Sequence, residues 1–130
     1  MPEFEVLIKA ATQARGNAHA QFSNFKVGAA LRTVEGKIFG GCNVENATYG
    51  LTVCAERVAI FKAISEGERR FNAIAVVTDT DTLTPPCGAC RQVIWEFCGD
   101  VPVVMANLKG KSEIFKMSEL FPRPFDVSNL

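Results

Sequence analysis

Two cysteine-containing segments constrain the fold of this chain more than any other feature, because they must meet in space to act together. Cys54 lies two residues before Glu56, and Cys87 and Cys90 have the Cys-x-x-Cys spacing that lets a loop and a helical turn clamp one zinc ion. Three thiolates fill three corners of a tetrahedron and leave the fourth for water, as in catalytic zinc sites. The pattern predicts that Cys54, Cys87 and Cys90 hold zinc and that Glu56 manages the protons of that water.

Length and charge narrow the class of protein. A chain of 130 residues is expected to form one domain, residues 1–130, with a core that needs no staples. Fourteen acidic residues balance 14 basic ones, which favours a small, near-neutral substrate over nucleic acid or an anionic membrane. No segment has the features of a signal peptide or the ~20 apolar residues of a membrane span. Five cysteines, an odd number, favour metal chemistry in a reducing compartment, so we expect a cytoplasmic protein.

Apolar periodicity predicts alternating helices and strands. Helices are expected at about residues 3–16, 54–66 and 90–97, strands at 26–34, 37–42, 71–78, 101–106 and 112–115, and a final helical turn at 118–120. Small residues from Gly28 to Ala30 indicate that another element packs closely there. The order implies an α/β fold with one sheet, its last strands parallel and helices on its faces. Both cysteine segments follow the strands at the carboxyl edge of that sheet and can therefore meet.

Asn43 and Glu45 form a weaker feature just after the second predicted strand. If the strand continues, its two-residue period points both side chains to one face and Val44 to the other. An amide beside a carboxylate suits the hydroxyls of a diol. A polar loop with local turn hydrogen bonds explains the same residues, and the pattern alone leaves both interpretations open.

Three thiolates give a zinc site a net negative charge, which weakens the metal as a Lewis acid. The expected position of Cys54 at a helix N-terminus favours its thiolate form, because unpaired N–H groups and the helix dipole point toward it. Arg57 and Arg91, each next to a motif residue, are predicted to donate hydrogen bonds to the sulfurs. Cys42 and Cys98 lie outside the ligand spacing and are expected to be core or surface thiols.

The segments Cys54-Ala55-Glu56 and Pro86-Cys87-Gly88-Ala89-Cys90 resemble the zinc nucleoside deaminase signature in its three-cysteine form. Residues 23–31, 41–51, 54–63 and 87–93 are similar to the small homotetrameric cytidine deaminases, and the resemblance extends over residues 5–125. It implies a three-layer α/β/α cytidine deaminase-like fold with a mixed five-stranded sheet and one Zn²⁺ per chain. It also implies hydrolytic deamination of cytidine and 2′-deoxycytidine to uridine, 2′-deoxyuridine and ammonia, a step of pyrimidine salvage.

The same resemblance implies roles for the side chains around the metal. Glu56 would take a proton from the attacking water, deliver it to N3 of the pyrimidine and later help to protonate the departing amine. Asn43 and Glu45 would bind the ribose 3′-hydroxyl, and Phe25 would pack beside the nucleoside.

The resemblance further implies a homotetramer whose subunits share active sites. Phe125 would stack on the pyrimidine of a neighbouring subunit, and Ala47 and Tyr49 would help to line the shared site. Two departures from the family pattern bear on this packing. Gln21-Phe22 stands where the family usually has Pro-Tyr, and Phe121 stands where it usually has leucine.

Three alternatives remain. The chain could instead deaminate blasticidin S, whose enzymes share the Cys-Ala-Glu core, or a modified cytosine nucleoside. Cys42 could complete a four-cysteine structural zinc site in a binding module, although Glu56 would then have no task. Cys87 and Cys90 could form a redox pair, although Cys54 would then be unexplained. A redox pair would purify without zinc, so metal content separates the last two alternatives.

Overall fold

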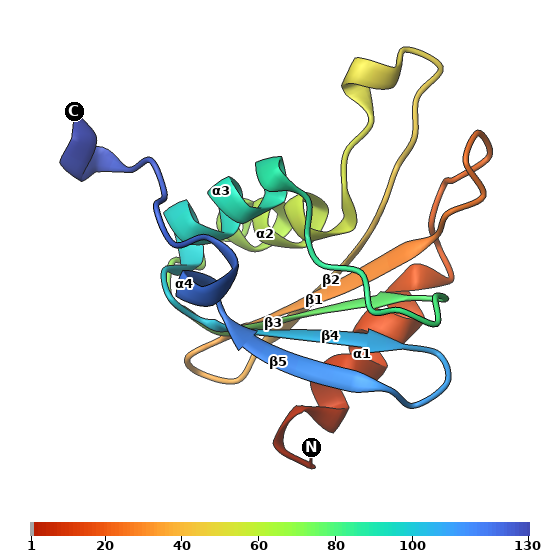
Figure 1. Ribbon diagram of the computed structural model, residues 1–130, viewed down its shortest axis with the longest axis horizontal. Coiled ribbons are helices and arrows are strands. Elements are labelled where there is room, and N and C mark those ends of the chain that lie inside the picture. The colour runs from red at the N-terminus through yellow and green to blue at the C-terminus, as the bar shows by residue number, and fades with distance from the viewer. Residues whose placement is uncertain (1) are drawn as a thin grey trace.

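A mixed five-stranded β-sheet forms the middle layer of this computed structural model, which describes residues 2–130 (Figure 1). The strands are β1 (Val27–Thr33), β2 (Ile38–Cys42), β3 (Phe71–Thr78), β4 (Pro102–Asn107) and β5 (Ser112–Lys116). Their order in the sheet is β2-β1-β3-β4-β5. Strands β3 and β4 are parallel, and the other neighbours are antiparallel. The predicted hairpin and the mixed sheet are confirmed.

The prediction that the last strands run parallel is right for β3 and β4 but wrong for β5. The chain between β3 and β4 contains a whole helix, which is long enough for the crossover that parallel pairing requires. Only residues 108–111 separate β4 from β5, and so short a turn forces antiparallel pairing, with Ala106 opposite Ser112.

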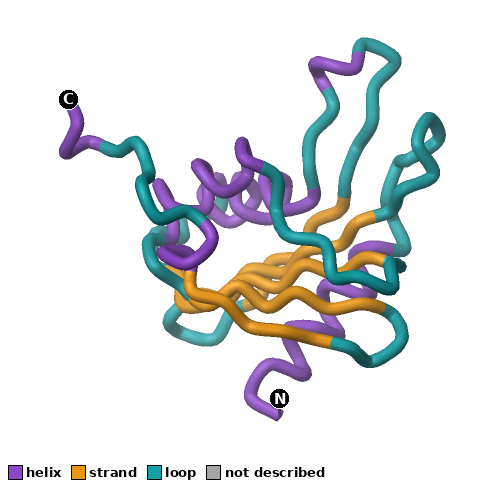
Figure 2. Tube along the Cα trace, in the orientation of Figure 1, coloured by secondary structure: helices purple, strands orange, loops and turns teal. Residues whose placement is uncertain are grey.

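Helices cover both faces of the sheet (Figures 1 and 2). Helix α1 (Glu5–Arg15) lies on one face, while α2 (Ala55–Ser65) and α3 (Gly88–Cys98) lie side by side on the other. After β5 the chain forms the short helix α4 (Met117–Leu120) near the end of α3. The helices among residues 2–130 all fall short of the length and apolar character that crossing a bilayer requires.

Alternation along the central strand β3 explains why both faces are covered. Ala73, Ala75 and Val77 belong to the core cluster beneath α1, whereas Ile74 belongs to the cluster beneath α2 and α3. A strand that is apolar on both faces needs a helix layer on each side to bury it. The three-layer α/β/α arrangement is therefore confirmed.

Two glycines in the hairpin let helices approach from opposite faces. A Cβ atom at Gly28 would lie 1.9 Å from the main-chain oxygen of Ala11 in α1. A Cβ atom at Gly41 would lie 2.6 Å from the main-chain oxygen of Ala55 in α2. The predicted close packing at Gly28 is confirmed, and Gly41 sets how closely the first turn of α2 lies against β2.

Candidate active site

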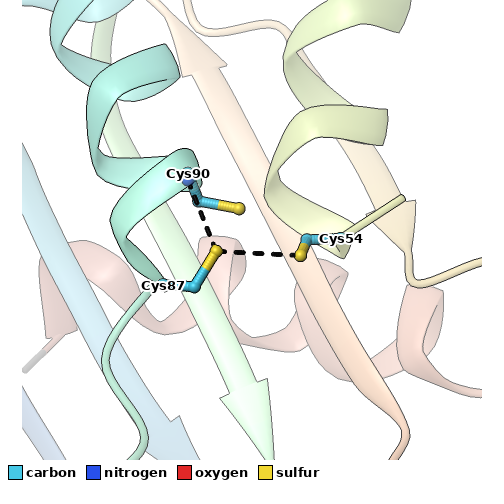
Figure 3. A group of neighbouring side chains, drawn as sticks. All are labelled: Cys54, Cys87 and Cys90. Atoms are coloured by element: carbon cyan, nitrogen blue, oxygen red, sulfur yellow. Dashed lines mark hydrogen bonds between the residues drawn. The ribbon is translucent and has the colours of Figure 1, made fainter. Parts of the chain in front are cut away.

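Cys54, Cys87 and Cys90 come together where the N-terminal ends of α2 and α3 face each other, and their sulfur atoms point toward one another (Figure 3). All three sulfur atoms lie within 4.8 Å of one another, and those of Cys54 and Cys87 are 3.9 Å apart. Sulfurs that bind one zinc ion tetrahedrally at roughly 2.3 Å lie roughly 3.8 Å from each other. The spacing and the chemistry of these donors therefore fit one zinc ion per chain.

The backbone at the two helix starts places these ligands. Cys54 and Cys87 are the N-cap residues of α2 and α3, each with an extended backbone, and Cys90 lies in the first turn of α3. The main-chain N–H of Cys90 donates to the sulfur of Cys87 at 3.4 Å. Helix α3 begins earlier than the predicted residue 90, because Cys87 itself caps the helix. Both helix dipoles thus point their positive ends at the sulfurs.

A row of threonine hydroxyls supports the loop that leads to Cys87. The Oγ1 atoms of Thr78 and Thr80 are 2.9 Å apart, and those of Thr80 and Thr84 are 3.2 Å apart. The side-chain amide of Asn107 in β4 donates to the main-chain oxygen of Thr80 at 2.9 Å. Sequence reasoning missed this support, and its one signal is Thr78, a hydroxyl that follows the apolar residues Ala73 to Val77 of β3.

Arg57 lies against the metal-ligand cluster. Its Nη2 donates to the sulfur of Cys54 at 3.4 Å, and its Nε is buried without a hydrogen-bond partner among residues 2–130. The hydrogen bond from the Cys90 thiol lowers the pKa of Cys54 well below its ordinary value, and Arg57 lowers it further. The same Cys54 contact, together with burial, raises the pKa of Cys90. The guanidinium thus contacts the sulfur whose thiolate form it favours.

Arg91 takes a different position from the one predicted. Its Nε donates to the main-chain oxygen of Pro86 at 2.8 Å, and its Nη1 donates to that of Leu120 at 2.7 Å. The hydrogen bonds that the structure gives Arg91 therefore go to carbonyl groups, which are stronger acceptors than sulfur. Arg91 joins the residue before Cys87 to the end of α4 and so acts on the metal site through its loop.

Glu56 is buried beside the cluster, with 4% of its surface exposed. Burial, aided by the negative charge of Cys54, raises the pKa of Glu56 to about 7. A carboxyl group with a pKa near neutrality can both accept and release a proton, as a general acid–base residue must.

A cavity of about 190 Å³ opens over Glu56, Cys54 and Cys87. The predicted site residues that line it are Phe25, Asn43, Cys54, Glu56 and Cys87. Sequence reasoning gave no role to the remaining lining residues, which are Val27, Thr52, Ala55, Val76, Thr78, Thr84 and Pro85. The cavity is small, so it suits a ligand of low molecular mass.

Asn43 and Glu45 face the same segment of chain, as the two-residue alternation predicts. Beyond β2 the backbone stays extended, because Val44 bridges to His19 and to Val53. The side chain of Asn43 donates to the main-chain oxygen of Phe25 at 2.7 Å and accepts from the N–H of Val27 at 2.9 Å. Glu45 binds the neighbouring residues 22–23. Both side chains thus bind residues 22–27, far away in sequence, and not the local turn that the loop interpretation expected.

A second hollow, of about 350 Å³, adjoins the cavity and shares Thr52 with it. Glu45 and Tyr49 line this hollow, together with Phe22 and Ser23. The ring of Phe22, one of the departures from the family pattern, meets the ring of Tyr49 edge to face with their centres 6.2 Å apart. The change from the usual tyrosine to Phe22 therefore lies at the wall of this hollow.

Ala47 and Phe125 line neither of these two hollows. Ala47 is exposed in the loop before the 3₁₀ turn Tyr49–Leu51, and Phe125 is 59% exposed in the C-terminal segment. That segment is held by α3, where the side-chain amide of Gln92 donates to the main-chain oxygen of Phe125 at 2.6 Å. Phe121, the second departure, packs against the core cluster beneath α2 and α3.

The remaining cysteines stand apart from the cluster. Among residues 2–130, the group of potential ligands around Cys54 contains neither Cys42 nor His19. Burial raises the pKa of Cys98, at the end of α3, to about 12, as expected of an unreactive core thiol. The four-cysteine structural site is therefore wrong, because Cys42 does not reach the cluster.

Comparisons with known proteins agree with this geometry. Residues 1–106 match the family described as the cytidine and deoxycytidylate deaminase zinc-binding region. A cytidine deaminase of Sporosarcina psychrophila is 50% identical over 98% of this chain and 95% of its own length. The crystal structure of a cytidine deaminase from Burkholderia pseudomallei superposes with a TM-score of 0.90 at 51% identity, covering 92% of this chain and 97% of that one. A blasticidin-S deaminase of Bacillus cereus is 35% identical over 74% of each chain.

Proposed function

Because the chain belongs to the cytidine and deoxycytidylate deaminase family, we propose that it deaminates cytidine and 2′-deoxycytidine to uridine and 2′-deoxyuridine, releasing ammonia in pyrimidine salvage. The observation that carries the proposal is the cluster of three cysteine sulfurs beside the buried carboxyl group of Glu56. This combination supplies a metal site and a proton carrier on the wall of one small cavity.

Cys54, Cys87 and Cys90 would hold the zinc ion. When bound, zinc supplies a Lewis acid that makes water a nucleophile at neutral pH. The protein offsets the charge of three thiolates with the two helix N-termini and with the guanidinium of Arg57 on Cys54.

Glu56 would carry the protons of the reaction. Addition of water to C4 of the pyrimidine requires removal of one water proton and protonation of N3, and loss of ammonia requires a further proton on the amino group. One buried carboxyl group with a pKa near 7 can perform these transfers in turn, because it gains and loses a proton at little cost near neutral pH.

The nucleoside would lie between the zinc site and the segment 22–27. Phe25 would pack beside the nucleoside, while Asn43 and Glu45 would bind the ribose 3′-hydroxyl. Asn43 is suited to this role, because each end of its amide keeps capacity beyond the one hydrogen bond it makes to the main chain. The carboxylate of Glu45 has about four lone-pair sites, of which three accept from residues 22–23 and one stays open.

The active unit would be a homotetramer with shared sites. Tyr49 is 75% exposed, and Phe125 is also largely exposed, which costs free energy unless another surface covers these rings. Phe125 would stack on the pyrimidine in a neighbouring subunit, and Ala47 and Tyr49 would help to line that site.

Residues 1–130 would act as one deaminase domain in the cytoplasm. A single sheet gathers strands from Val27 to Lys116, which supports one domain. The three zinc ligands must remain reduced to bind the metal, which the reducing cytoplasm ensures.

A spectrophotometric assay of the purified protein with cytidine and 2′-deoxycytidine, run beside a zinc determination, tests the proposal. We expect one zinc per chain and loss of cytidine absorbance. Consumption of blasticidin S in place of both nucleosides would replace the proposed substrate, and a protein with zinc that consumes none of the three would contradict the proposed function.

A further inference from the structure

Ser23 lies in the segment 22–27, against which the nucleoside would lie, but the proposed mechanism gives this residue no role. It lies in the turn before Phe25 and lines the hollow that also contains Glu45. Its hydroxyl has two hydrogen-bond partners, and they are the two neighbours that the proposed function places against the nucleoside.

The first partner is the carboxylate of Glu45, which three donors hold in place. Its Oε1 accepts from the main-chain N–H groups of Phe22 at 3.0 Å and Ser23 at 3.1 Å. Its Oε2 accepts from the Ser23 hydroxyl. The N–H groups fix one oxygen, and the hydroxyl fixes the rotation of the carboxylate plane. Oε1 already accepts two hydrogen bonds, whereas Oε2 keeps one lone-pair site for a hydrogen bond from a ligand.

The second partner is Phe25, whose main-chain N–H donates to Oγ of Ser23 at 3.0 Å. Asn43 holds the opposite edge of the same segment through Phe25 and Val27. Between the two, Asn24 has a left-handed backbone (φ 59°), which asparagine tolerates better than most residues. The hydroxyl of Ser23 therefore connects the carboxylate to the segment that carries the Phe25 ring.

The electrostatics agree with this geometry. The hydrogen bond from the Ser23 hydroxyl is the largest cause that lowers the pKa of Glu45, and the N–H groups of Ser23 and Phe22 lower it further. The carboxyl group therefore stays ionised, and an ionised acceptor makes a stronger hydrogen bond to a sugar hydroxyl than a neutral one does.

We propose that Ser23 is a positioning residue that aims the Glu45 carboxylate at the 3′-hydroxyl of the nucleoside and so sets the preference for sugars that carry this hydroxyl. This inference rests on the proposed function, which puts the ribose against Asn43 and Glu45. It adds a residue whose effect is exerted through Glu45 and not on the reacting base.

The test compares cytidine with 3′-deoxycytidine for the wild type, Ser23→Ala and Ser23→Thr, each as the zinc-loaded protein. Loss of a hydrogen bond to a charged group should lower kcat/KM for cytidine about tenfold in Ser23→Ala. For 3′-deoxycytidine the change should stay below about twofold, because that substrate has no hydroxyl for Glu45 to accept from. Ser23→Thr retains the hydroxyl and should keep the wild-type ratio, as should Ser65→Ala, which removes an exposed serine hydroxyl at the end of α2.

A double-mutant cycle shows whether Ser23 acts through Glu45. Glu45→Gln should reduce the preference for cytidine by itself, and adding Ser23→Ala should then change the ratio no further. If Ser23→Ala lowered kcat/KM equally for both substrates, Ser23 would only support the turn. If Ser23→Ala changed kcat/KM for neither substrate, the inference would likewise be overturned. If the wild type deaminates cytidine and Ser23→Ala keeps the wild-type ratio of kcat/KM for the two substrates, only this inference is contradicted. If the wild type consumes neither nucleoside, the proposed function is contradicted as well.

Discussion

Two parts of the proposed active site, the zinc corner and the outer rim, differ in how much of each a single chain builds. We define the zinc corner as Cys54, Glu56, Arg57, Cys87 and Cys90, and the rim as Glu45, Ala47, Tyr49 and Phe125. The corner lies on two helix starts packed against the sheet, and its ligand atoms already fit one metal ion. The rim lies on a loop and on the C-terminal segment, and much of it is exposed. The comparison shows that one chain brings the candidate zinc ligands together, and it supports the proposal that a second chain helps to enclose the substrate.

Loss of a ligand from the zinc corner should have the largest effect. Cys87→Ala is expected to lose zinc and with it all measurable deamination, because two remaining thiolates cannot hold the metal site. Metal analysis beside the assay checks this prediction. Cys42→Ala is the matched control and should keep one zinc per chain, since Cys42 lies outside the cluster. Full zinc occupancy in Cys87→Ala would contradict the ligand assignment.

Removal of the proposed proton carrier, Glu56, should leave the metal in place. Glu56→Gln is expected to keep zinc and the fold but to lose at least ~10²-fold in kcat, the contribution of one general acid–base group. Glu96→Gln, an exposed carboxyl group on α3, is the control and should retain full turnover. Near-normal kcat in Glu56→Gln would remove this residue from the mechanism.

A methyl group placed between α2 and the sheet should displace α2, whose first turn carries part of the zinc corner. In Gly41→Ala the new Cβ would lie 2.5 Å from the main-chain nitrogen of Ala59, so the helix must shift. Overpacking of this kind costs about 1–3 kcal/mol, which should lower the Tm by roughly 4–11 °C. Gly50→Ala meets no atom within 4 Å and should leave the Tm unchanged. An equal Tm for both variants would show that α2 is not held by this contact.

A change in the rim should affect substrate binding more than turnover. Phe125→Ala is expected to raise KM for cytidine about three- to tenfold with kcat nearly unchanged, because it removes one aromatic contact and leaves the zinc corner intact. Val127→Ala, an exposed apolar residue two positions further on, serves as the control. Unchanged KM in Phe125→Ala would show that this ring does not reach a substrate.

The same contrast explains how much of the molecule the sequence predicts. The ligand set of Cys54, Cys87 and Cys90 follows from thiolate chemistry and spacing, and strands β1 to β4 follow from apolar patterning, because both signals are local. The antiparallel pairing of β5 depends on the length of a turn, which patterning does not weigh. Arg91 donates to the carbonyl group of Leu120 in α4, and not to sulfur as predicted. Its choice of acceptor depends on the position of α4 in the fold, which the sequence pattern does not give.

Roles that depend on hydroxyl groups or on other subunits are harder to read from a sequence. The hydroxyl groups of Ser23 and Thr78 form hydrogen bonds that depend on the three-dimensional fold. Serine and threonine are too common for their presence in a sequence to indicate such a role. The roles of Ala47, Tyr49 and Phe125 stay predictions, because they concern a surface that a second copy of the chain would provide.

Mixing two defective chains tests most directly whether one active site combines the zinc corner of one chain with the rim of another. Glu56→Gln and Phe125→Ala chains would be co-expressed, and the KM for cytidine of the mixed assembly would be compared with that of Phe125→Ala alone. If sites are shared, an intact Glu56 in one chain meets an intact Phe125 from its neighbour, and a fraction of sites recovers the wild-type KM. A mixture in which every active site keeps the raised KM of Phe125→Ala would contradict the account.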